Sequence, residues 1–438
     1  GTTATVDRSL GTAASICTQK VGGAMSLNST LDDDLFENGL GTNGTGAMLF
    51  WVKNGSLALG ESVSISVAGG TQAPIVIVGF NSIRSDLSTS IQSNRPTITL
   101  GAQTSALGTS WDVYNLSLTG TGTPVLTMGA NGKIINSKIV NTSTTAARLA
   151  LSLANESIVF AVEAISYRGN AVSIGSNNTT IAYSYLHDSD KCFTTSSTGT
   201  QITLLGNLVV GCVTSGIATS AADTSRFALI GNTIYGAENK LGTCVSLATG
   251  TTDVIMLNNI IAGCVTGVSH ADTQNTGFDD YNAYFNNTTD VSNWIKGSHN
   301  SALNPTFTSV AQLTGSTATT SGSVLTQSGG DFSTVTDGVD FLYLVSGTGI
   351  TAGQYKITGH TATTVTLDIA PGTNATADKV WQITTGHNFA IGTNLKALGF
   401  PGGFPGALST GYMDIGAAQR QEEGSGGGPL IGPGRLVR

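Results

Sequence analysis

Charged residues are scarce in this chain: they make up 11% of its 438 residues, with 19 basic and 27 acidic side chains and a net charge of −8. An acidic, weakly charged chain lacks the basic surface that contacts phosphate backbones, so we expect no nucleic-acid partner. No apolar run reaches the length that crosses a bilayer, the longest being short segments such as residues 73–80, so we expect no membrane span. Neutral partners such as glycans suit this composition better.

Cysteine is also scarce, and its five residues do not form an even set. Cys17 lies far in the sequence from Cys192, Cys212, Cys244 and Cys264. Cys212 and Cys264 occupy the same place in the repeat described below but two coils apart, about 9.6 Å, which is beyond disulfide reach. We therefore expect free, small interior cysteines rather than a full disulfide framework. The chain opens at Gly1 with no charged-then-apolar leader, so we expect an initiator Met or signal peptide to have been removed.

The sequence contains an internal repeat instead of helical periodicity. A mostly small polar position recurs at residues 115, 137, 161, 184, 207, 232, 259 and 282, with successive spacings of 22, 24, 23, 23, 25, 27 and 23 residues. Two residues before this position the side chain is apolar in every case except Asp280, as expected for short strands with alternating faces. The pattern predicts an all-β fold, a right-handed parallel β-helix with coils of about 23 residues.

Asparagine occupies five of these repeat positions. An Asn at one place in each coil can hydrogen-bond to the Asn of the coils above and below it, which satisfies polar groups in a buried turn. We interpret the series as a structural ladder and not as a binding site, because ladders occur in solenoids of every function. The predicted ladder consists of Asn115, Asn207, Asn232, Asn259 and Asn282.

The composition divides the chain into five regions. We expect an N-terminal cap over residues 1–46, which includes the acidic stretch 31–37, and a parallel β-helix over residues 47–307. Alternating strand patterns between Gly- and Asn-containing turns predict a small inserted antiparallel barrel or sandwich over residues 308–386. Residues 387–423 would close the β-helix. A Gly-rich terminus is ordered only when something holds it, so we expect the tail, residues 424–438, to dock on a neighbouring subunit.

Several segments resemble known β-helix proteins. Residues 50–82 (FWVKNGSLALGESVSISVAGGTQAPIVIVGFNS) and 94–98 (NRPTI) resemble the opening coils of pectate-lyase-like β-helix proteins, and FDDYNAYFNN with NPTF resembles their closing coils. TGYMDIGAAQRQE near the C-terminus is similar to the end of β-helix proteins of tailed phages and environmental viruses. The resemblance covers roughly residues 47–307 and 387–420. It implies a β-helix fold and a fibre or spike of a virion, homotrimeric and in contact with surface glycans and other virion or surface proteins.

Enzymes with this fold act on polysaccharides through groups of carboxylates on one face of adjacent coils, and two groups of acidic residues in this chain are candidates. The best local cluster is His187, Asp188 and Asp190 with Lys191, just outside a strand, and we regard it as a candidate site whose alternative is a solvated turn. Asp279 and Asp280 form another acidic pair inside the closing segment, where a structural role is the stronger interpretation. A Gly-His-Gly followed by Arg-x-Lys, which polygalacturonase-like enzymes would add, is absent.

We assign neither metal nor cofactor from the sequence. The consecutive acids Asp32, Asp33 and Asp34 do not alternate as calcium-binding loops do. Three functions remain open at this stage. The first is a non-enzymatic structural protein of a virion appendage. The second is a secreted or tailspike-type polysaccharide depolymerase, either a lyase or a glycoside hydrolase, and the third is a bacterial surface filament or adhesin subunit. All three predict a virion, extracellular or cell-surface location.

Overall fold

A computed structural model describes residues 24–26, 48–58, 63–65, 74–80, 95–143, 145–175, 177–195, 201–220, 226–236, 242–273, 277–307, 309–389, 391, 393–396, 398–399 and 415–417. The expected tail over 424–438 lies outside these residues. So do Cys17 and the expected cap over 1–46, apart from residues 24–26.

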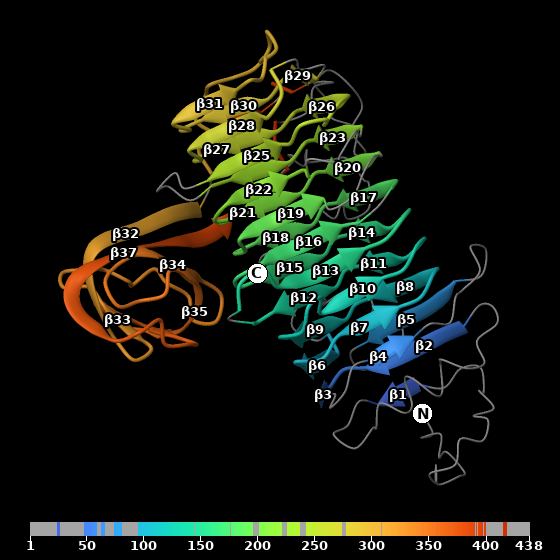
Figure 1. The fold of residues 1–438 in the computed structure, drawn as a ribbon, viewed down its shortest axis with the longest axis horizontal. Helices are drawn as coiled ribbons and strands as arrows, with labels where there is room; N and C mark the ends of the chain where they lie inside the picture. The colour runs from blue at the N-terminus through green and yellow to red at the C-terminus, as the bar shows by residue number, and fades with distance from the viewer. Residues whose placement is uncertain are drawn as a thin grey trace.

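The described residues form a parallel β-solenoid with a separate antiparallel barrel at its side (Figure 1). The solenoid has three parallel sheets, which we call A, B and C, and each coil adds one strand to each sheet in turn. The prediction of a right-handed parallel β-helix is confirmed. Apart from one 3₁₀ turn, Thr393–Leu395, the assigned elements are all strands.

The strand bounds follow the coil order. Sheet A contains β1 (Ala24–Ser26), β2 (Met48–Lys53), β5 (Ile75–Phe80), β8 (Trp111–Tyr114), β11 (Lys133–Ile135), β14 (Ile158–Phe160), β17 (Thr179–Ala182), β20 (Ile202–Leu205), β23 (Phe227–Ile230), β26 (Val254–Leu257) and β29 (Phe278–Asp280). Sheet B contains β3 (Ser56–Ala58), β6 (Thr97–Gly101), β9 (Ser117–Gly120), β12 (Lys138–Asn141), β15 (Glu163–Ser166), β18 (Tyr185–His187), β21 (Leu208–Val210), β24 (Thr233–Tyr235), β27 (Ile260–Ala262) and β30 (Ala283–Phe285). Sheet C contains β4 (Val63–Ile65), β7 (Ser105–Leu107), β10 (Leu126–Met128), β13 (Leu149–Leu153), β16 (Asn170–Ile174), β19 (Lys191–Thr195), β22 (Ser215–Ala218), β25 (Thr243–Leu247), β28 (Thr266–His270) and β31 (Thr289–Ser292).

The core is a continuous apolar column inside the solenoid. Each coil contributes an inward aliphatic side chain to it, and the register places these residues directly above one another. Val113, Ile134, Val159, Ile181 and Leu204 follow each other in sheet A, and all are at most 1% exposed. Burying a side chain of this size stabilises the fold by about 1.5–3 kcal/mol. Every coil therefore depends on its neighbours for most of its stability.

The turn between sheets A and B explains the recurring asparagines. Asn207 donates from Nδ2 to Asn232 Oδ1 at 3.0 Å, Asn232 donates to Asn259 at 3.0 Å, and Asn259 donates to Asn282 at 2.9 Å. The Oδ1 atom of each of the last three also accepts the backbone N–H of the preceding rung. Four buried carboxamides thus bond to one another and to the chain, which satisfies polar groups that would be costly to bury alone.

Asn115 does not belong to this ladder. Sheet register pairs Ile134 with Val113, which aligns Asn115 with Asn136 and places both one residue before the ladder position. Both residues have left-handed backbone, with φ of 56° and 51°, and the Asn136 side chain donates to Asn115 Oδ1. The ladder position in this coil is Leu116, whose backbone N–H is accepted by Ser137 Oγ. Asparagine suits both positions because it tolerates the left-handed region, so residue type alone does not set the register.

The outer face of sheet C carries a row of short polar side chains. Successive strands place one outward residue above the next, and Ala106 and Ala218 are the exceptions to a Ser/Thr pattern. The polar members are Thr127, Ser152, Ser173, Thr194, Ser246, Ser269 and Ser292. Except for the buried Ala218, the residues of this row are partly or fully exposed. This is the pattern of a sheet face that remains in water.

The inserted region forms a closed six-stranded barrel in the order β32 (Ser309–Ser321), β33 (Val324–Thr326), β36 (Thr364–Leu367), β35 (Gly353–His360), β34 (Phe341–Ser346) and β37 (Asn374–Asn388). The predicted small antiparallel domain is therefore a barrel. It has its own core, which includes Phe332, Leu344, Ile357 and Trp381. The first and last strands pair Ser309 with Asn388, so the chain leaves and re-enters the solenoid at adjacent points.

Candidate functional site

From β12 to β30 the outer face of sheet B is largely apolar, and other parts of this chain cover it. Three small clusters span the contact, and Figure 1 shows the barrel beside this face. Phe341 of the barrel packs on Val140, Ile165 and Tyr167. The members of the next cluster are Tyr185, Leu208, Val210 and Phe389, and those of the last are Ile260, Ala262, Ala283, Ile391, Leu395 and Ile415. The barrel and the chain that follows it therefore bury the outer face from β12 to β30.

His187, from the predicted cluster, lies within this covered face. It ends β18, and its imidazole stacks on the Tyr185 ring with centroids 3.7 Å apart. Nδ1 lies 2.6 Å from Asp188 Oδ2, and Nε2 lies 3.3 Å from Glu163 Oε1. Lys138 Nζ lies 2.7 Å from the same Glu163 oxygen. Two cations and two anions thus alternate along three successive coils, and we call these four residues the charge chain: Lys138, Glu163, His187 and Asp188.

The contacts of the charge chain shift the pKa values of His187 and Glu163. Burial alone would lower the pKa of His187, but hydrogen bonds to Asp188 and Glu163 outweigh it and raise the pKa above its usual value. Burial would likewise raise the pKa of Glu163, whereas the His187 hydrogen bond and the Lys138 charge lower it to about 2. Both ring nitrogens face carboxylates, so His187 binds them as an imidazolium that donates on both sides. Such a ring has no free nitrogen with which to take a proton from a substrate.

Asp190 does not join the charge chain. Its carboxylate accepts from the Thr214 hydroxyl on the following coil, and its backbone carbonyl accepts the Thr214 N–H at 2.8 Å. The structure thus brings His187 and Asp188 together and leaves Asp190 in a turn. Glu163 and Lys138 were missed in the sequence. The spacing of the coils could have revealed them, because Glu163 precedes His187 by 24 residues and Lys138 precedes Glu163 by 25, each close to the length of one coil.

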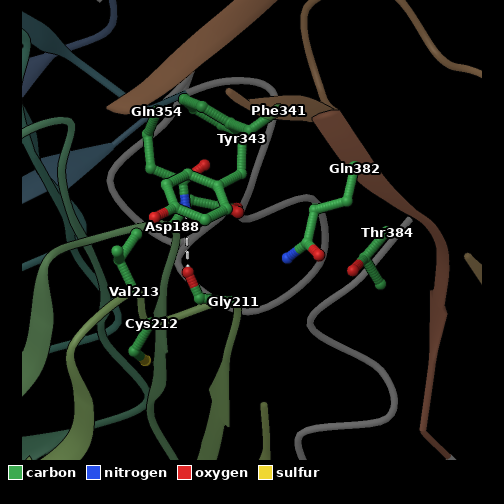
Figure 2. A pocket seen from close by; sticks show the side chains of 9 residues that line it. All are labelled: Asp188, Gly211, Cys212, Val213, Phe341, Tyr343, Gln354, Gln382 and Thr384. Carbon is green, nitrogen blue, oxygen red and sulfur yellow. Dashed lines mark hydrogen bonds between the residues drawn. The ribbon is translucent and has the colours of Figure 1, made fainter. Parts of the chain in front are cut away.

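A small hollow lies where the barrel meets the solenoid (Figure 2). Asp188, Gly211 and Val213 line one side, and Tyr343 and Gln354 are among the barrel residues on the other. Gln354 Nε2 crosses the junction and donates to the Gly211 carbonyl at 2.8 Å. The hollow comprises about 330 Å³ of space that includes open solvent, and its closed part has room for roughly one water molecule. A sugar ring does not fit this closed part.

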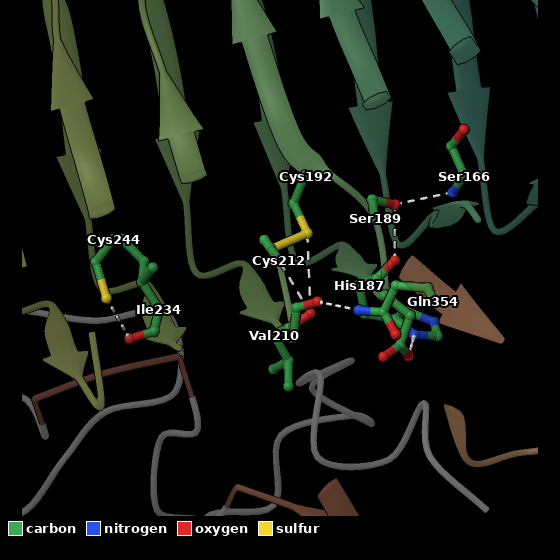
Figure 3. The surroundings of a disulfide bond; sticks show 11 residues. Ser166, His187, Ser189, Cys192, Val210, Cys212, Ile234, Cys244 and Gln354 are labelled. Atoms are coloured by element: carbon green, nitrogen blue, oxygen red, sulfur yellow. Dashed lines mark hydrogen bonds and ion pairs between the residues drawn. A yellow bond between two sulfur atoms is a disulfide. The ribbon is translucent and has the colours of Figure 1, made fainter. Parts of the chain in front are cut away.

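Two disulfides correct the expectation of free cysteines. Cys192 is bonded to Cys212, with a Cα–Cα distance of 5.7 Å (Figure 3). Cys244 is bonded to Cys264, with a Cα–Cα distance of 5.8 Å. Each bond joins a sheet C strand to the turn after sheet B in the next coil. Cys212 and Cys264, the two cysteines whose spacing argued against a bond, occupy equivalent turns two coils apart. The missed signal was the identical separation of 20 residues in both pairs, slightly less than one coil. Cys212 also lines the hollow, so the first disulfide fixes one wall of the junction.

Asp279 and Asp280 are also committed to internal contacts. Asp279 accepts from Trp294 Nε1 at 2.7 Å and from the Tyr284 hydroxyl in the buried closing coil. Asp280 accepts from the backbone N–H of His299 at 2.8 Å and lies 2.7 Å from its Nδ1. These contacts lower the pKa of Asp280 against the opposing effect of burial. Both carboxylates therefore hold residues 294–300 against the last coil.

The comparisons with known proteins give structural likenesses at low identity. No protein-family model matches the chain, and no curated protein matches its sequence. Among solved structures, pectate lyase Pel9A is 11% identical, covers 86% of this chain and 89% of its own, and has a TM-score of 0.48. The Dettilon tailspike protein gp208 is 12% identical, with coverage of 83% and 94% and a TM-score of 0.38.

A tailspike double mutant of E. coli bacteriophage HK620, solved in complex with a pentasaccharide, is 10% identical over 83% of this chain and 91% of its own, with a TM-score of 0.23. Likenesses at this level bear on the fold alone.

The described residues contain no group of three or more His, Cys, Asp or Glu side chains placed to hold a metal ion. Among these same residues, no helix is long and apolar enough to cross a membrane. The residues at the junction have a structural role, because they attach the barrel to the solenoid. A charge-balanced row of side chains, a hydrogen bond across the junction and three apolar clusters hold the barrel and the described residues that follow it on sheet B.

Proposed function

We propose that this protein is a non-enzymatic structural subunit of a virion appendage, a fibre or spike, in which the solenoid is a rigid shaft that carries the barrel at its side. The proposal rests on one observation: the candidate acidic residues are already bound within the chain. Glu163, Asp188, Asp190, Asp279 and Asp280 all bind groups of this chain. Polysaccharide hydrolysis needs two carboxylates that flank the substrate across an open site.

Two further properties support an extracellular shaft. Buried disulfides such as Cys192–Cys212 form and persist in oxidising surroundings, which favours a location outside the cytosol. A solenoid in which each coil buries the next is stiff along its axis and needs few charges. We further propose that the subunit forms a homotrimer and contacts host-surface glycans through hydroxyl-rich outer faces such as the Ser/Thr row of sheet C.

Electron microscopy of the native source tests the proposal directly. We expect antibodies against this chain to label projections on virus particles. Labelling of cell-attached filaments with helical symmetry would overturn the virion assignment in favour of a bacterial surface filament.

Catalysis is tested separately, by incubating the purified full chain with capsular and plant polysaccharides and measuring oligosaccharide release. We expect no release. Release that is lost in the variant Asp188→Asn or Asp190→Asn, but not in a variant of the Ser/Thr row such as Ser173→Ala, would show that the protein is a depolymerase.

A further inference from the structure

The outer face of sheet A differs from that of sheet C in having at least one apolar outward side chain on every strand from β2 to β29. Two columns of outward side chains run from β2 to β29, one residue per coil in each column. We call their apolar members the apolar strip: Leu49, Trp51, Val76, Val78, Tyr114, Ile135, Ile158, Phe160, Ala182, Leu205, Ala228, Ile230, Ile255, Leu257 and Phe278. The polar members of the columns are Asp112, Lys133, Thr180, Thr203 and Asp280.

The strip contains several of the most exposed large apolar side chains of the described residues. Phe278 is 51% exposed, Leu49 50%, Ile255 41% and Ile158 40%. Ten strands about 4.8 Å apart make the two columns about 43 Å long, and a width of about 12 Å gives them an area of roughly 500 Å², of which about a quarter lies at the polar positions. With a polar rim, this approaches the approximately 800 Å² per partner of a stable interface. A patch of this size lies near the upper end of what monomeric proteins leave in water, and such patches are often functional.

Charge within the two columns is compensated. The chain as a whole has a net charge of −8, which makes two copies repel each other. On sheet A, however, Lys133 Nζ lies 3.3 Å from Asp112 Oδ2, and Asp280 is bound to His299. An identical surface can therefore approach this face without meeting an unpaired like charge.

We propose that the apolar strip is the surface through which copies of this chain associate, with the strip of one shaft against the strip of the next. A second copy has a strip of the same length and the same spacing of about 4.8 Å, so its side chains stay in step along the whole shaft. A chain of any other architecture would match only part of it. This inference rests on the homo-oligomer of the proposed function and names the surface that forms it.

The test measures the mass of the full chain by sedimentation over a range of micromolar concentrations. We expect the wild type to be an oligomer, and Ile158→Asp with Ile255→Asp to weaken association by about a hundredfold or more. The matched control is Val265→Asp with Ile295→Asp, which changes two exposed apolar side chains outside the strip. We expect this control to associate like the wild type, and circular dichroism to show the same fold in all three proteins.

A milder substitution keeps the test decisive if the aspartate variant fails to fold. Thr203→Cys in the strip columns should cross-link copies with a short bismaleimide, whereas Thr194→Cys on the sheet C row should not. An oligomer that persists in the aspartate variant, or equal cross-linking at both cysteines, would overturn the strip as the interface and leave the homo-oligomer standing. A monomeric wild type would overturn both the strip as an interface and the homo-oligomer. This is also the result expected if a segment of the same chain covers the strip.

Discussion

The outer face of sheet A and that of sheet B from β12 to β30 are both largely apolar, but they are covered differently. On sheet B, Phe341 of the barrel and Phe389 after it lie over the aromatic and aliphatic side chains of β12 to β21. On sheet A, Ile158 and Ile255 stay 40% and 41% exposed among the described residues. On sheet B, where the cover is seen, the outward apolar columns mark a contact. For sheet B the contact is within the chain, and for sheet A we infer that it is between chains.

The largest effect should come from removing the cover of sheet B. We expect replacement of residues 309–388 by a short Gly linker to cost several kcal/mol, about 1.5–3 kcal/mol for each large side chain uncovered. The linker is feasible because Ser309 and Asn388 are paired. The variant should bind a hydrophobic dye and form larger assemblies than the wild type. Dye binding equal to that of the wild type would show that the barrel is not what keeps this face dry.

A smaller loss should follow from opening the disulfide beside the junction. We expect Cys192→Ala with Cys212→Ala to lower the free energy of unfolding by about 3 kcal/mol, since a loop of this length is released in the unfolded chain. Chemical denaturation measures the change. Cys244→Ala with Cys264→Ala is the matched control for loop length and should show a similar loss. Only the first pair should loosen the barrel, as seen by faster hydrogen exchange in β34 and β35.

The charge chain makes the cover of sheet B sensitive to pH. The raised pKa of His187 means that its contribution is complete below about 6.5 and is lost as the pH rises through the folded-state value. Glu163, with a pKa of about 2 against an ordinary 4.5, contributes fully above 4.5 and loses this contribution as the pH falls towards 2. We therefore expect the unfolding temperature to be highest between these limits. His187→Gln should remove the alkaline decline and Glu163→Gln the acidic one, and unchanged declines would contradict the assignment.

The smallest effect on stability should come from making sheet C resemble sheet A. We expect Ser173→Ile with Thr194→Ile to change the free energy of unfolding by no more than about 0.5 kcal/mol for each substitution, because both side chains lie at the surface. Self-association should nevertheless increase, which light scattering detects. If even a longer run of such substitutions left association unchanged, apolar character alone would not explain the behaviour expected of sheet A.

The sequence predicted the solenoid because its spacing is a property of the chain itself. It did not fix the register of every coil: Asn115 satisfies the same residue preference as the ladder position but has the left-handed backbone of the residue before it. His187 and Asp188 were found because they are adjacent in sequence. Glu163 was not, since its contact depends on how one coil lies on the next. The sequence could not predict that the barrel covers sheet B either, because this contact depends on how the two domains pack.

The two disulfides make the resistance of the shaft to unfolding unequal along its axis. A solenoid loses structure from its ends, one coil after another, since each coil contacts only its neighbours. A break that starts beyond β29 and travels towards the N-terminus meets the Cys244–Cys264 bond first and the Cys192–Cys212 bond two coils later. Neither pair of coils can separate at these points while the bonds persist. Unravelling from the far end should therefore stop before it reaches the coils that carry the barrel.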